Sequence, residues 1–505
     1  MRNLIKKEIE KVVGKADFDV FRSENFGDYS SNVAMILKKN PQEIAQKIKS
    51  DFIEKIETAG PGFLNFWLSE KGIERGLKEI FKKPKIKHQK IQVEFISANP
   101  TGELHIGHGR GAFYGNALAN VLEKAGHKVE QEYFINDSEQ SIQIKSLHRT
   151  AGIIKLEKEG ALFADWKKPY ETEYLKKLIK SGKVNFRNVE KEIQKDNEDF
   201  ITNVLRIKFD KWFSEENKLR KKGKFEETLR LLEEKGFVYK KDGAKWLKTS
   251  DYGDDKDEVI VRSSGTYGYF LSDIAYHINK FERGFDKVID VWGADHQGHI
   301  KRMLAVKKML RWKGDLDILI SQMVTVKEKG EIKKLSKRKG TIILLKDLVK
   351  EIGLDACRWF YLEKALSTQM EIDLALAKER SKKNPVYYVQ YAGARMCSIL
   401  AKANLKSQIS NLKIKNLKLQ ERNLLLKLIQ FTEVVEDIIK DYQVQRLITY
   451  AYELAKVFTD FYENVPVLKA ETEELKKTRL NLVFITRKIL EQALGLIGIS
   501  APEKM

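Results

Sequence analysis

The chain has 505 residues, 42% of them hydrophobic and 10% aromatic, so it is long enough for about three domains that each bury a core. Its 93 lysines and arginines exceed its 72 acidic residues, and the net charge of +21 favours a polyanionic partner, of which nucleic acid is the commonest. Its apolar runs fall short of the about 18 residues that span a membrane, and its N-terminus lacks a signal-peptide core, so we expect a cytoplasmic protein without a membrane partner.

Residues 1–83 are expected to form a small α+β domain. Helical patterns alternate there with a turn at residues 25–29, and the domain closes with residues 59–66, which begin Ala-Gly-Pro-Gly. These residues alone do not indicate what the domain does.

A turn with two histidines follows, and we call residues 105–109 the histidine turn. An apolar run before it and small, helix-favouring residues after it predict strand, turn and helix. His105 and His108 would face the same way at the helix start, where free backbone N–H groups attract anions. Gly107 and Gly109 lack Cβ atoms, which would let a flat base or a phosphate approach the backbone. We predict a nucleotide triphosphate site; the alternative is a glycine turn with two surface histidines.

Two later strands complete the prediction of an α/β domain over residues 84–383. The strand pattern at residues 129–137 lies one helix after the histidine turn, and such a βαβ unit implies a Rossmann-like parallel sheet. Residues from about 140 to 245 are charged and helical in pattern, which indicates an insertion between the two halves of the sheet. The apolar strand at residues 288–292 should face the first strand across the point where the strand order reverses.

A basic loop spans residues 331–341. It contains Lys334 and Lys337 within a run of lysines. Such runs are usually solvated surface loops, and the residues alone leave that interpretation open.

Residues 384–505 are helical in pattern to the end, so an all-α helical bundle is expected there. Apolar residues recur at helical spacing on two faces, formed by Leu447, Tyr450, Ala451, Leu454, Phe458 and Phe461, and by Leu482, Ile485, Ile489, Ala493 and Leu496. Aromatic residues at this spacing are more often core than platforms for bases, so the role of any single tyrosine stays open.

The histidine turn resembles the His-Ile-Gly-His signature of class I aminoacyl-tRNA synthetases. The longer stretch from Glu94 to Arg110, Glu-x-x-x-x-Asn-Pro-Thr-Gly-x-Leu-His-Ile-Gly-His-Gly-Arg, resembles arginyl-tRNA synthetases in particular. Lys-Leu-Ser-Lys at residues 334–337 resembles the second class I signature, with leucine in place of the usual methionine.

Both ends of the chain resemble the same family. Residues 1–83 carry the Gly-Asp-Tyr turn and Gly-Pro-Gly-Phe-Leu-Asn close of its N-terminal domain, and residues 384–505 resemble its anticodon-binding domain. Phe26 and Gly393 depart from the family pattern, which has a polar residue and a histidine at these positions.

The resemblance implies an arginine–tRNA ligase. Such an enzyme uses ATP to activate L-arginine as arginyl-adenylate and transfers it to the 3'-terminal adenosine of tRNA(Arg), with activation that depends on tRNA. The residues it assigns to ATP are His105, Gly107, His108, Gly293, Asp295, Lys334 and Lys337. The two histidines would hold the phosphates, and the two lysines would neutralise charge at the α-phosphate and the leaving group. Mg²⁺ is expected to bridge the phosphates, without a metal site built from protein side chains.

A guanidinium substrate requires planar acceptors, because its donors form a rigid fork that carboxylates match. The resemblance implies Glu94, Asp273 and the Tyr269 hydroxyl for this task, and the four-residue spacing of Tyr269 and Asp273 would place both on one helix face. The full set of expected arginine-binding residues is Glu94, Asn99, His105, Tyr269, Asp273 and His296.

In the family, tRNA contacts the N-terminal domain with its elbow and the bundle with its anticodon. The residues expected at the anticodon are Tyr388, Tyr391, Arg395 and Met505. A monomer is expected.

Two other functions compete with this hypothesis. Another class I enzyme, such as a glutamyl-type synthetase or a small nucleotidylyltransferase, could use the same turn, but an acidic substrate would want Arg or Lys where this chain has Glu94 and Asp273. A non-catalytic tRNA-binding paralogue should have lost a signature histidine or lysine, and this chain keeps all four.

Overall fold

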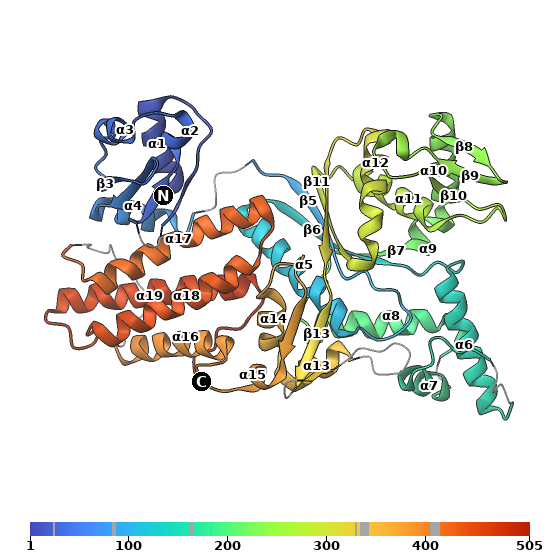
Figure 1. The fold of residues 1–505 in the computed structure, drawn as a ribbon. Coiled ribbons are helices and arrows are strands. Elements are labelled where there is room, and N and C mark those ends of the chain that lie inside the picture. The colour runs from blue at the N-terminus through green and yellow to red at the C-terminus, as the bar shows by residue number, and fades with distance from the viewer. Residues whose placement is uncertain are drawn as a thin grey trace. The chain divides into compact units, whose positions relative to one another are not determined.

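The computed structural model describes residues 1–23, 26–82, 87–161, 166–182, 184–328, 343–403 and 415–505, and the backbone of residues 331–333. These residues fall into two compact units (Figure 1). The central unit is Lys87–Glu379, and the composite unit combines Met1–Ile86 with Arg380–Met505. Each helix in the described ranges is too short or too polar to cross a membrane.

The central unit is built on a parallel sheet with the strand order β12–β11–β5–β6–β7 (Figure 1). The strands are β5 (Lys90–Glu94), β6 (Lys128–Ile135), β7 (Lys211–Ser214), β11 (Lys287–Gly293) and β12 (Asp315–Ser321). The chain order runs outward from β5 on both sides, so it reverses between β5 and β11. In open parallel sheets, ligands bind beyond the carboxyl ends of the strands at this reversal.

Helix α5 (Ile106–Ala125) connects β5 to β6 and completes the predicted βαβ unit. It is buried along most of its length, which explains its small and apolar composition. At Gly115 a Cβ atom would come within 2.2 Å of the Phe95 ring, so glycine lets the helix pack against the end of the strand. The predicted Rossmann-like α/β class is confirmed.

Further elements extend the central unit. Its other helices are α6 (Ile142–Lys158), α7 (Glu173–Lys180), α8 (Val189–Asp199), α9 (Glu215–Lys218), α10 (Lys224–Glu234), α11 (Tyr269–Glu282), α12 (Ile300–Leu310), α13 (Leu345–Ile352), α14 (Leu354–Leu362) and α15 (Leu374–Lys378). Its smaller sheets contain β8 (Val238–Lys241), β9 (Ala244–Leu247) and β10 (Glu258–Val261), and β13 (Val324–Glu328), β14 (Glu331–Lys333) and β15 (Met370–Asp373). The segment from about 140 to 245, predicted as an insertion, also contributes β7, the edge strand of the main sheet.

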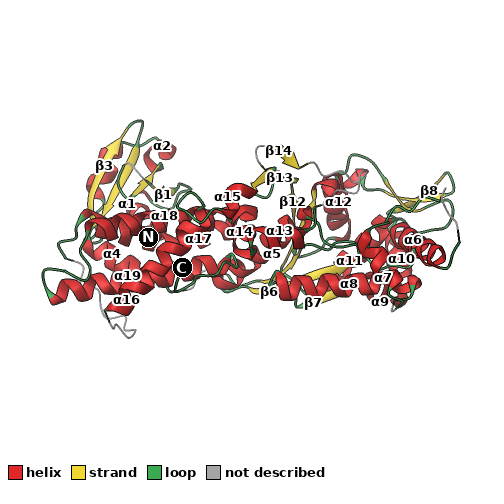
Figure 2. Cartoon of the chain, turned by 90° about the horizontal axis from the view of Figure 1, so that it is seen from below, coloured by secondary structure: helices red, strands yellow, loops and turns green. Residues whose placement is uncertain are grey.

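The composite unit joins an N-terminal antiparallel sheet to C-terminal helices (Figure 2). The N-terminal elements are α1 (Arg2–Val13), β1 (Val20–Arg22), β2 (Tyr29–Ser31), α2 (Val33–Leu37), α3 (Pro41–Lys47), β3 (Ile53–Ala59), β4 (Phe63–Leu68) and α4 (Glu70–Glu79). The C-terminal helices are α16 (Pro385–Lys402), α17 (Leu419–Asp441), α18 (Gln445–Asn464) and α19 (Glu473–Leu496). Leu447 and Phe458 on α18 and Ile489 on α19 are fully buried, and the predicted all-α bundle is confirmed.

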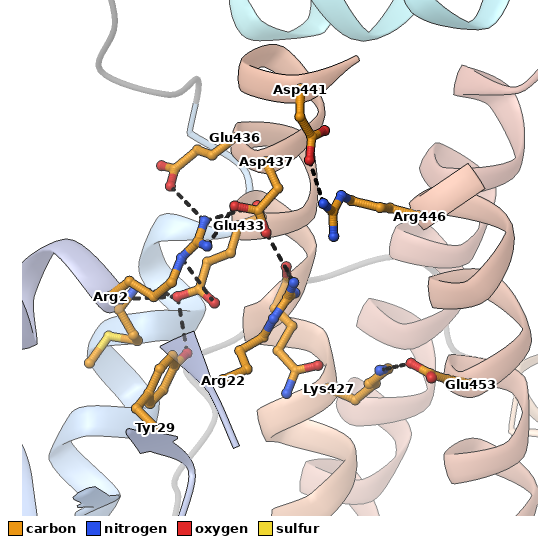
Figure 3. A network of polar contacts seen from close by, with 12 residues as sticks. Arg2, Arg22, Tyr29, Lys427, Glu433, Glu436, Asp437, Asp441, Arg446 and Glu453 are labelled. Carbon is orange, nitrogen blue, oxygen red and sulfur yellow. Dashed lines mark hydrogen bonds and ion pairs between the residues drawn. The ribbon is translucent and has the colours of Figure 1, made fainter. Parts of the chain in front are cut away.

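Charged residues hold the N-terminal domain against α17 (Figure 3). Glu433 is 2% exposed and accepts a hydrogen bond from the Tyr29 hydroxyl at 3.1 Å. Arg2 donates to one oxygen of Asp437 at 2.6 Å, and Arg22 donates to the other at 3.1 Å. We call these five residues the α17 network.

Candidate active site

The turn between β5 and α5 has an unusual backbone. Ile96 and Ser97 have φ angles of 68° and 42°, in the left-handed region that costs a non-glycine residue about 1–3 kcal/mol. The Phe134 amide donates to the Ser97 hydroxyl at 3.1 Å, and the Ala98 amide donates to the Tyr133 hydroxyl at 3.1 Å. These bonds to β6 hold the strained turn, and strain of this kind clusters at functional sites.

The two histidines cap the N-terminus of α5. His105 Nδ1 accepts from the Gly107 amide at 3.1 Å, and His108 Nδ1 accepts from the His105 amide at 3.1 Å. The two rings stack with centroids 3.8 Å apart, so the prediction that they face the same way is confirmed. Because each Nδ1 is an acceptor, each neutral ring carries its hydrogen on Nε2. Both rings are therefore in the tautomer whose Nε2–H can donate to an anion.

The glycines of the histidine turn serve packing inside the protein. A Cβ atom at Gly107 would lie 2.9 Å from the His105 ring, so glycine allows that ring to form the cap. A Cβ atom at Gly109 would lie 2.8 Å from the Tyr361 ring. The prediction that the missing Cβ atom lets a base or a phosphate approach the backbone is therefore wrong at Gly109, because Tyr361 fills that space.

The second signature, with Lys334 and Lys337, lies outside the described residues. The described residues after it, from residue 343 on, are hydrogen-bonded to the histidine turn and to Leu104. Ile106 donates its amide to the Ile343 carbonyl at 3.1 Å, and the Leu345 amide donates to the Leu104 carbonyl at 2.9 Å. The described residues on the C-terminal side of the signature thus lie beside the histidine turn.

Helix α11 carries a polar stripe that leads from the surface into the core. Tyr269, Asp273, His277 and Lys280 follow at intervals of three or four residues, so they share one helix face. Exposure falls from 48% at Tyr269 to 2% at His277 and 0% at Lys280. The predicted helical spacing of Tyr269 and Asp273 is confirmed. Sequence reasoning missed His277 and Lys280, although the same periodicity contained the signal.

The inner end of the α11 stripe forms a buried cluster with the sheet. Glu94 and Asp290 are register partners on β5 and β11. The Lys280 ammonium donates to Glu94 and, at 2.7 Å, to Asp290 Oδ1. His277 Nε2 lies 2.8 Å from Asp290 Oδ2, and its Nδ1 lies 2.8 Å from the Asp273 carbonyl oxygen. We call Glu94, His277, Lys280 and Asp290 the buried charge cluster.

Burial and pairing set the charge of these carboxylates. Burial raises the pKa of Glu94, while Lys280 opposes the rise. Burial acts in the same direction on Asp290, but Lys280 and His277 outweigh it and lower the pKa of Asp290 to about 2. Burial raises the pKa of Asp273 to about 6. Among the described residues no hydrogen bond or ion pair engages the partly exposed Asp273 carboxylate, so the stripe offers an open acceptor for a cation.

The remaining predicted nucleotide and amino-acid residues follow β5 and β11. Gly293 ends β11, and Asp295 and His296 lie in the short helix η5 (Ala294–His299). The Asp295 carboxylate and the His296 ring are both exposed and lie 3.6 Å apart. The Asn99 amide donates to Gln143 Oε1 at 2.6 Å.

Helix α16 presents a tyrosine and an arginine side by side. Arg395 donates to the Tyr391 hydroxyl at 3.0 Å, and its guanidinium lies 5.2 Å from the centroid of that ring. Tyr391 is 36% exposed and Met505 is 51% exposed. The Tyr388 hydroxyl instead donates to Thr459 on α18 at 3.2 Å. Tyr391 and Arg395 thus form an accessible aromatic–cation pair, whereas Tyr388 is engaged within the bundle.

Cavity volume does not locate the site. Cavities of about 730 and 700 Å³ open around Phe186 and Arg187 in the predicted insertion, and no predicted site residue lines them. In the part of the chain that the structure describes, no three His, Cys, Asp or Glu side chains gather as metal ligands. The side chains at the ends of β5 and β11 therefore locate the candidate site better than cavity volume does.

Comparisons with known proteins cover the whole chain. The matching family models are the arginyl tRNA synthetase N terminal domain at residues 1–68, the catalytic domain of tRNA synthetases class I (R) at residues 76–378, and the DALR anticodon binding domain at residues 389–505. The arginine–tRNA ligase of Bacillus subtilis is 38% identical over 100% of this chain and 99% of its own.

Solved structures agree with these matches. A putative arginyl-tRNA synthetase from Campylobacter jejuni is 31% identical with a TM-score of 0.76, over 86% of this chain and 99% of its own. The arginyl-tRNA synthetase of Thermus thermophilus shares the fold, with a TM-score of 0.78 at 22% identity over 100% of both chains. The family and activity expected from the sequence are confirmed. The chain belongs to the arginyl-tRNA synthetases, the class I aminoacyl-tRNA synthetases that act as arginine–tRNA ligases.

Proposed function

We propose that the carboxyl ends of β5 and β11 hold the reaction centre of this arginine–tRNA ligase, with arginine at the α11 stripe and ATP at the histidine turn. The observation that carries this assignment is the open Asp273 carboxylate beside a cluster whose other carboxylates are paired within the chain. A cationic substrate side chain supplies the partner that Asp273 lacks. Neither adenylate formation nor transfer to tRNA needs a protein nucleophile, so catalysis depends on positioning and charge stabilisation.

In the first step the arginine carboxylate attacks the α-phosphorus of ATP. A new oxygen–phosphorus bond forms, the bond to the bridging oxygen breaks, and pyrophosphate leaves. The Nε2–H groups of His105 and His108 donate to phosphate oxygens, and Lys334 and Lys337 neutralise charge that develops at the α-phosphate and the leaving group. In the second step a ribose hydroxyl of the terminal adenosine of tRNA attacks the carbonyl carbon of arginyl-adenylate, the bond from that carbon to the phosphate oxygen breaks, and AMP and the hydroxyl proton leave.

The nucleotide site also includes Gly107, Gly293 and Asp295. The histidine turn supplies donors for phosphate oxygens and no carboxylate cage, so it does not fit a metal ion held by the protein itself. Mg²⁺ would enter with ATP, held by the phosphates, and would neutralise part of their charge.

Arginine recognition uses the outer half of the α11 stripe. The Asp273 carboxylate and the free acceptor sites of Glu94 receive the guanidinium, and the Tyr269 hydroxyl lies one helical turn outward from Asp273. Asn99 and His296 bind the α-amino end of the substrate, and His105 completes the expected arginine-binding set.

The composite unit is assigned to tRNA(Arg). Tyr391 and Arg395 offer a stacking surface for unpaired anticodon bases, and Tyr388 and Met505 belong to the same expected contact. Domains 1–83, 84–383 and 384–505 act together in a cytoplasmic monomer.

Pyrophosphate exchange tests the assignment. Arginine, lysine, citrulline and glutamate are each offered with ATP, in the presence and absence of tRNA(Arg). We expect exchange with arginine in the presence of tRNA, and discrimination against lysine of as much as ~10⁴, because a point-charge ammonium leaves the fork-shaped acceptors unpaired. Citrulline activated as readily as arginine would show that charge is not recognised, and would overturn the roles of Glu94 and Asp273.

A further inference from the structure

Lys280 is the most deeply buried residue of the α11 stripe. Its ammonium bridges Glu94 at the end of β5 and Asp290 on the neighbouring strand. Like charges on adjacent strands repel, and a buried charge is tolerated only when it is paired. Lys280 is therefore at least the counter-ion that lets two carboxylates lie beside each other in the sheet.

The Glu94 carboxylate is held at both of its oxygens. The Ser97 hydroxyl donates to Oε1 at 2.8 Å, and the Lys280 ammonium donates to Oε2. Since Ser97 belongs to the strained turn, a rotation of the carboxylate would break bonds to that turn and to α11 together. An ionised carboxylate has about four acceptor sites, so Glu94 keeps acceptor capacity for a further donor.

We propose that Lys280 is a positioning residue for arginine recognition, which holds the Glu94 carboxylate in the orientation that receives the guanidinium together with Asp273. The inference rests on the role proposed above for Glu94 and names the group that fixes its orientation. Without the ammonium, burial would favour a protonated Glu94, which has fewer acceptor sites and no charge.

Lys280 has a second partner besides Glu94. Asp290 accepts from Lys280 through one oxygen and contacts His277 through the other. Both ring nitrogens of His277 face acceptors, the Asp290 carboxylate and the Asp273 carbonyl, so both contacts are hydrogen bonds when both nitrogens carry hydrogen. The chain of contacts runs from Glu94 through Lys280, Asp290 and His277 back to the backbone of Asp273.

Lys280→Met and Asp290→Asn make a matched pair of variants. Both break the buried Lys280–Asp290 pair, so both should lower the midpoint of thermal unfolding, but only Lys280→Met releases the Glu94 carboxylate. In tRNA charging, Lys280→Met should raise the arginine KM about tenfold or more while the ATP KM and kcat change less than about threefold, as expected when a charged hydrogen bond to the substrate site is lost. Asp290→Asn should change the arginine KM less than about threefold, because Glu94 stays bonded to Lys280.

Equal increases of the arginine KM in the two variants would overturn the proposal, and so would an unchanged KM in Lys280→Met. If Lys280→Met does not fold, the double variant Lys280→Met with Asp290→Asn removes the unpaired charge of Asp290 and still leaves Glu94 without its ammonium. A raised arginine KM in that variant supports the proposal, and a parental KM overturns it.

Glu94→Gln separates this proposal from the function on which it rests. If the arginine KM rises in Glu94→Gln and stays unchanged in Lys280→Met, the positioning role fails and the assignment of Glu94 stands. An unchanged KM in Glu94→Gln removes Glu94 from the arginine site and overturns both.

Discussion

The two units of this chain each contain a cluster of charges around a buried carboxylate. The clusters differ in whether all of their carboxylates have partners within the chain. In the α17 network, Glu433 receives the Tyr29 hydroxyl, and Asp437 is paired with both Arg2 and Arg22 (Figure 3). Each of its carboxylates has a cation or a hydroxyl of the chain as its partner. The network is closed, and it fastens the N-terminal domain to α17.

The buried charge cluster of the central unit is open at one end. Lys280 pairs with Glu94 and Asp290, but the stripe continues outward to Asp273, whose carboxylate no described donor contacts and whose pKa burial raises to about 6. In the α17 network each carboxylate lies beside a cation or a hydroxyl of the chain, whereas the buried charge cluster adjoins a carboxylate without such a partner, and a perturbed pKa at such a position indicates a functional site. The contrast supports our proposal that the first cluster is structural and the second recognises the substrate.

The largest effect is expected from Lys337→Ala. This variant tests whether adenylate formation occurs at the site proposed for arginine and ATP. We expect the single-turnover rate of adenylate formation to fall about 10²- to 10³-fold, because the lost charge is needed where charge develops in the transition state. Binding of ATP and arginine should change much less. Lys339→Ala removes a charge from the same loop outside the signature and serves as the control. An unchanged rate in Lys337→Ala would restore the interpretation of a solvated loop.

Asp273→Asn tests the open end directly. We expect the arginine KM to rise by about 10²-fold or more, since a partly buried guanidinium loses its charge partner, while the ATP KM hardly changes. Glu282→Gln, at an exposed position of the same helix, should behave like the parent enzyme. Titration of arginine in the charging assay distinguishes these outcomes, and a parental arginine KM in Asp273→Asn would remove the distinction between the two clusters.

Tyr391→Ala tests whether the composite unit has a tRNA-binding surface separate from the α17 network. Loss of one base stack should weaken tRNA binding by about 1–3 kcal/mol without changing the arginine KM. Tyr391→Phe keeps the ring, loses the bond from Arg395 and should bind nearly as the parent does. Filter binding at several salt concentrations measures both variants, and affinity should fall steeply with salt because of the net charge of +21. Equal affinities of the Ala and Phe variants would exclude stacking on this tyrosine.

The pH dependence of arginine binding should report Asp273. Its pKa lies at about 6 in the free enzyme, and only the ionised carboxylate attracts the guanidinium. As pH falls below that value, Asp273 gains a proton, so the arginine KM should rise up to about tenfold per pH unit. Above that value the KM should level off. In Asp273→Asn the acid limb should disappear, and a limb that persists in this variant would assign it to another group.

The part of this site that depends on local spacing could be predicted from the sequence. The histidine turn, its position at a helix start and the shared face of Tyr269 and Asp273 follow from spacings of three or four residues. Lys280 follows Asp273 by seven residues on the same helix, yet a lysine near a helix end is ordinarily a solvated charge.

The partners of Lys280 could not be predicted in this way. Glu94 lies 186 residues before it in the chain, and the two meet only because β5 and β11 are neighbours in a register that aligns Glu94 with Asp290. The left-handed backbone of Ile96 could not be predicted from the sequence either, because a β-branched residue ordinarily avoids a positive φ. Sequence periodicity therefore indicated which residues share a face, and strand order decided which faces meet.

The smallest effect on catalysis is expected from a variant of the α17 network. Glu433→Gln removes a buried carboxylate that faces Tyr29 and Arg2, and loss of one partner from such a pair costs on the order of 3 kcal/mol. The midpoint of thermal unfolding should fall by several degrees, while the arginine KM changes less than about twofold. Glu436→Gln is the matched control, because it lies on the same helix near Arg2 but is more exposed and 3.5 Å away. Calorimetry and the charging assay on the same preparations decide the matter: an arginine KM that rises in Glu433→Gln as it does in Asp273→Asn would show that the closed network also takes part in substrate recognition.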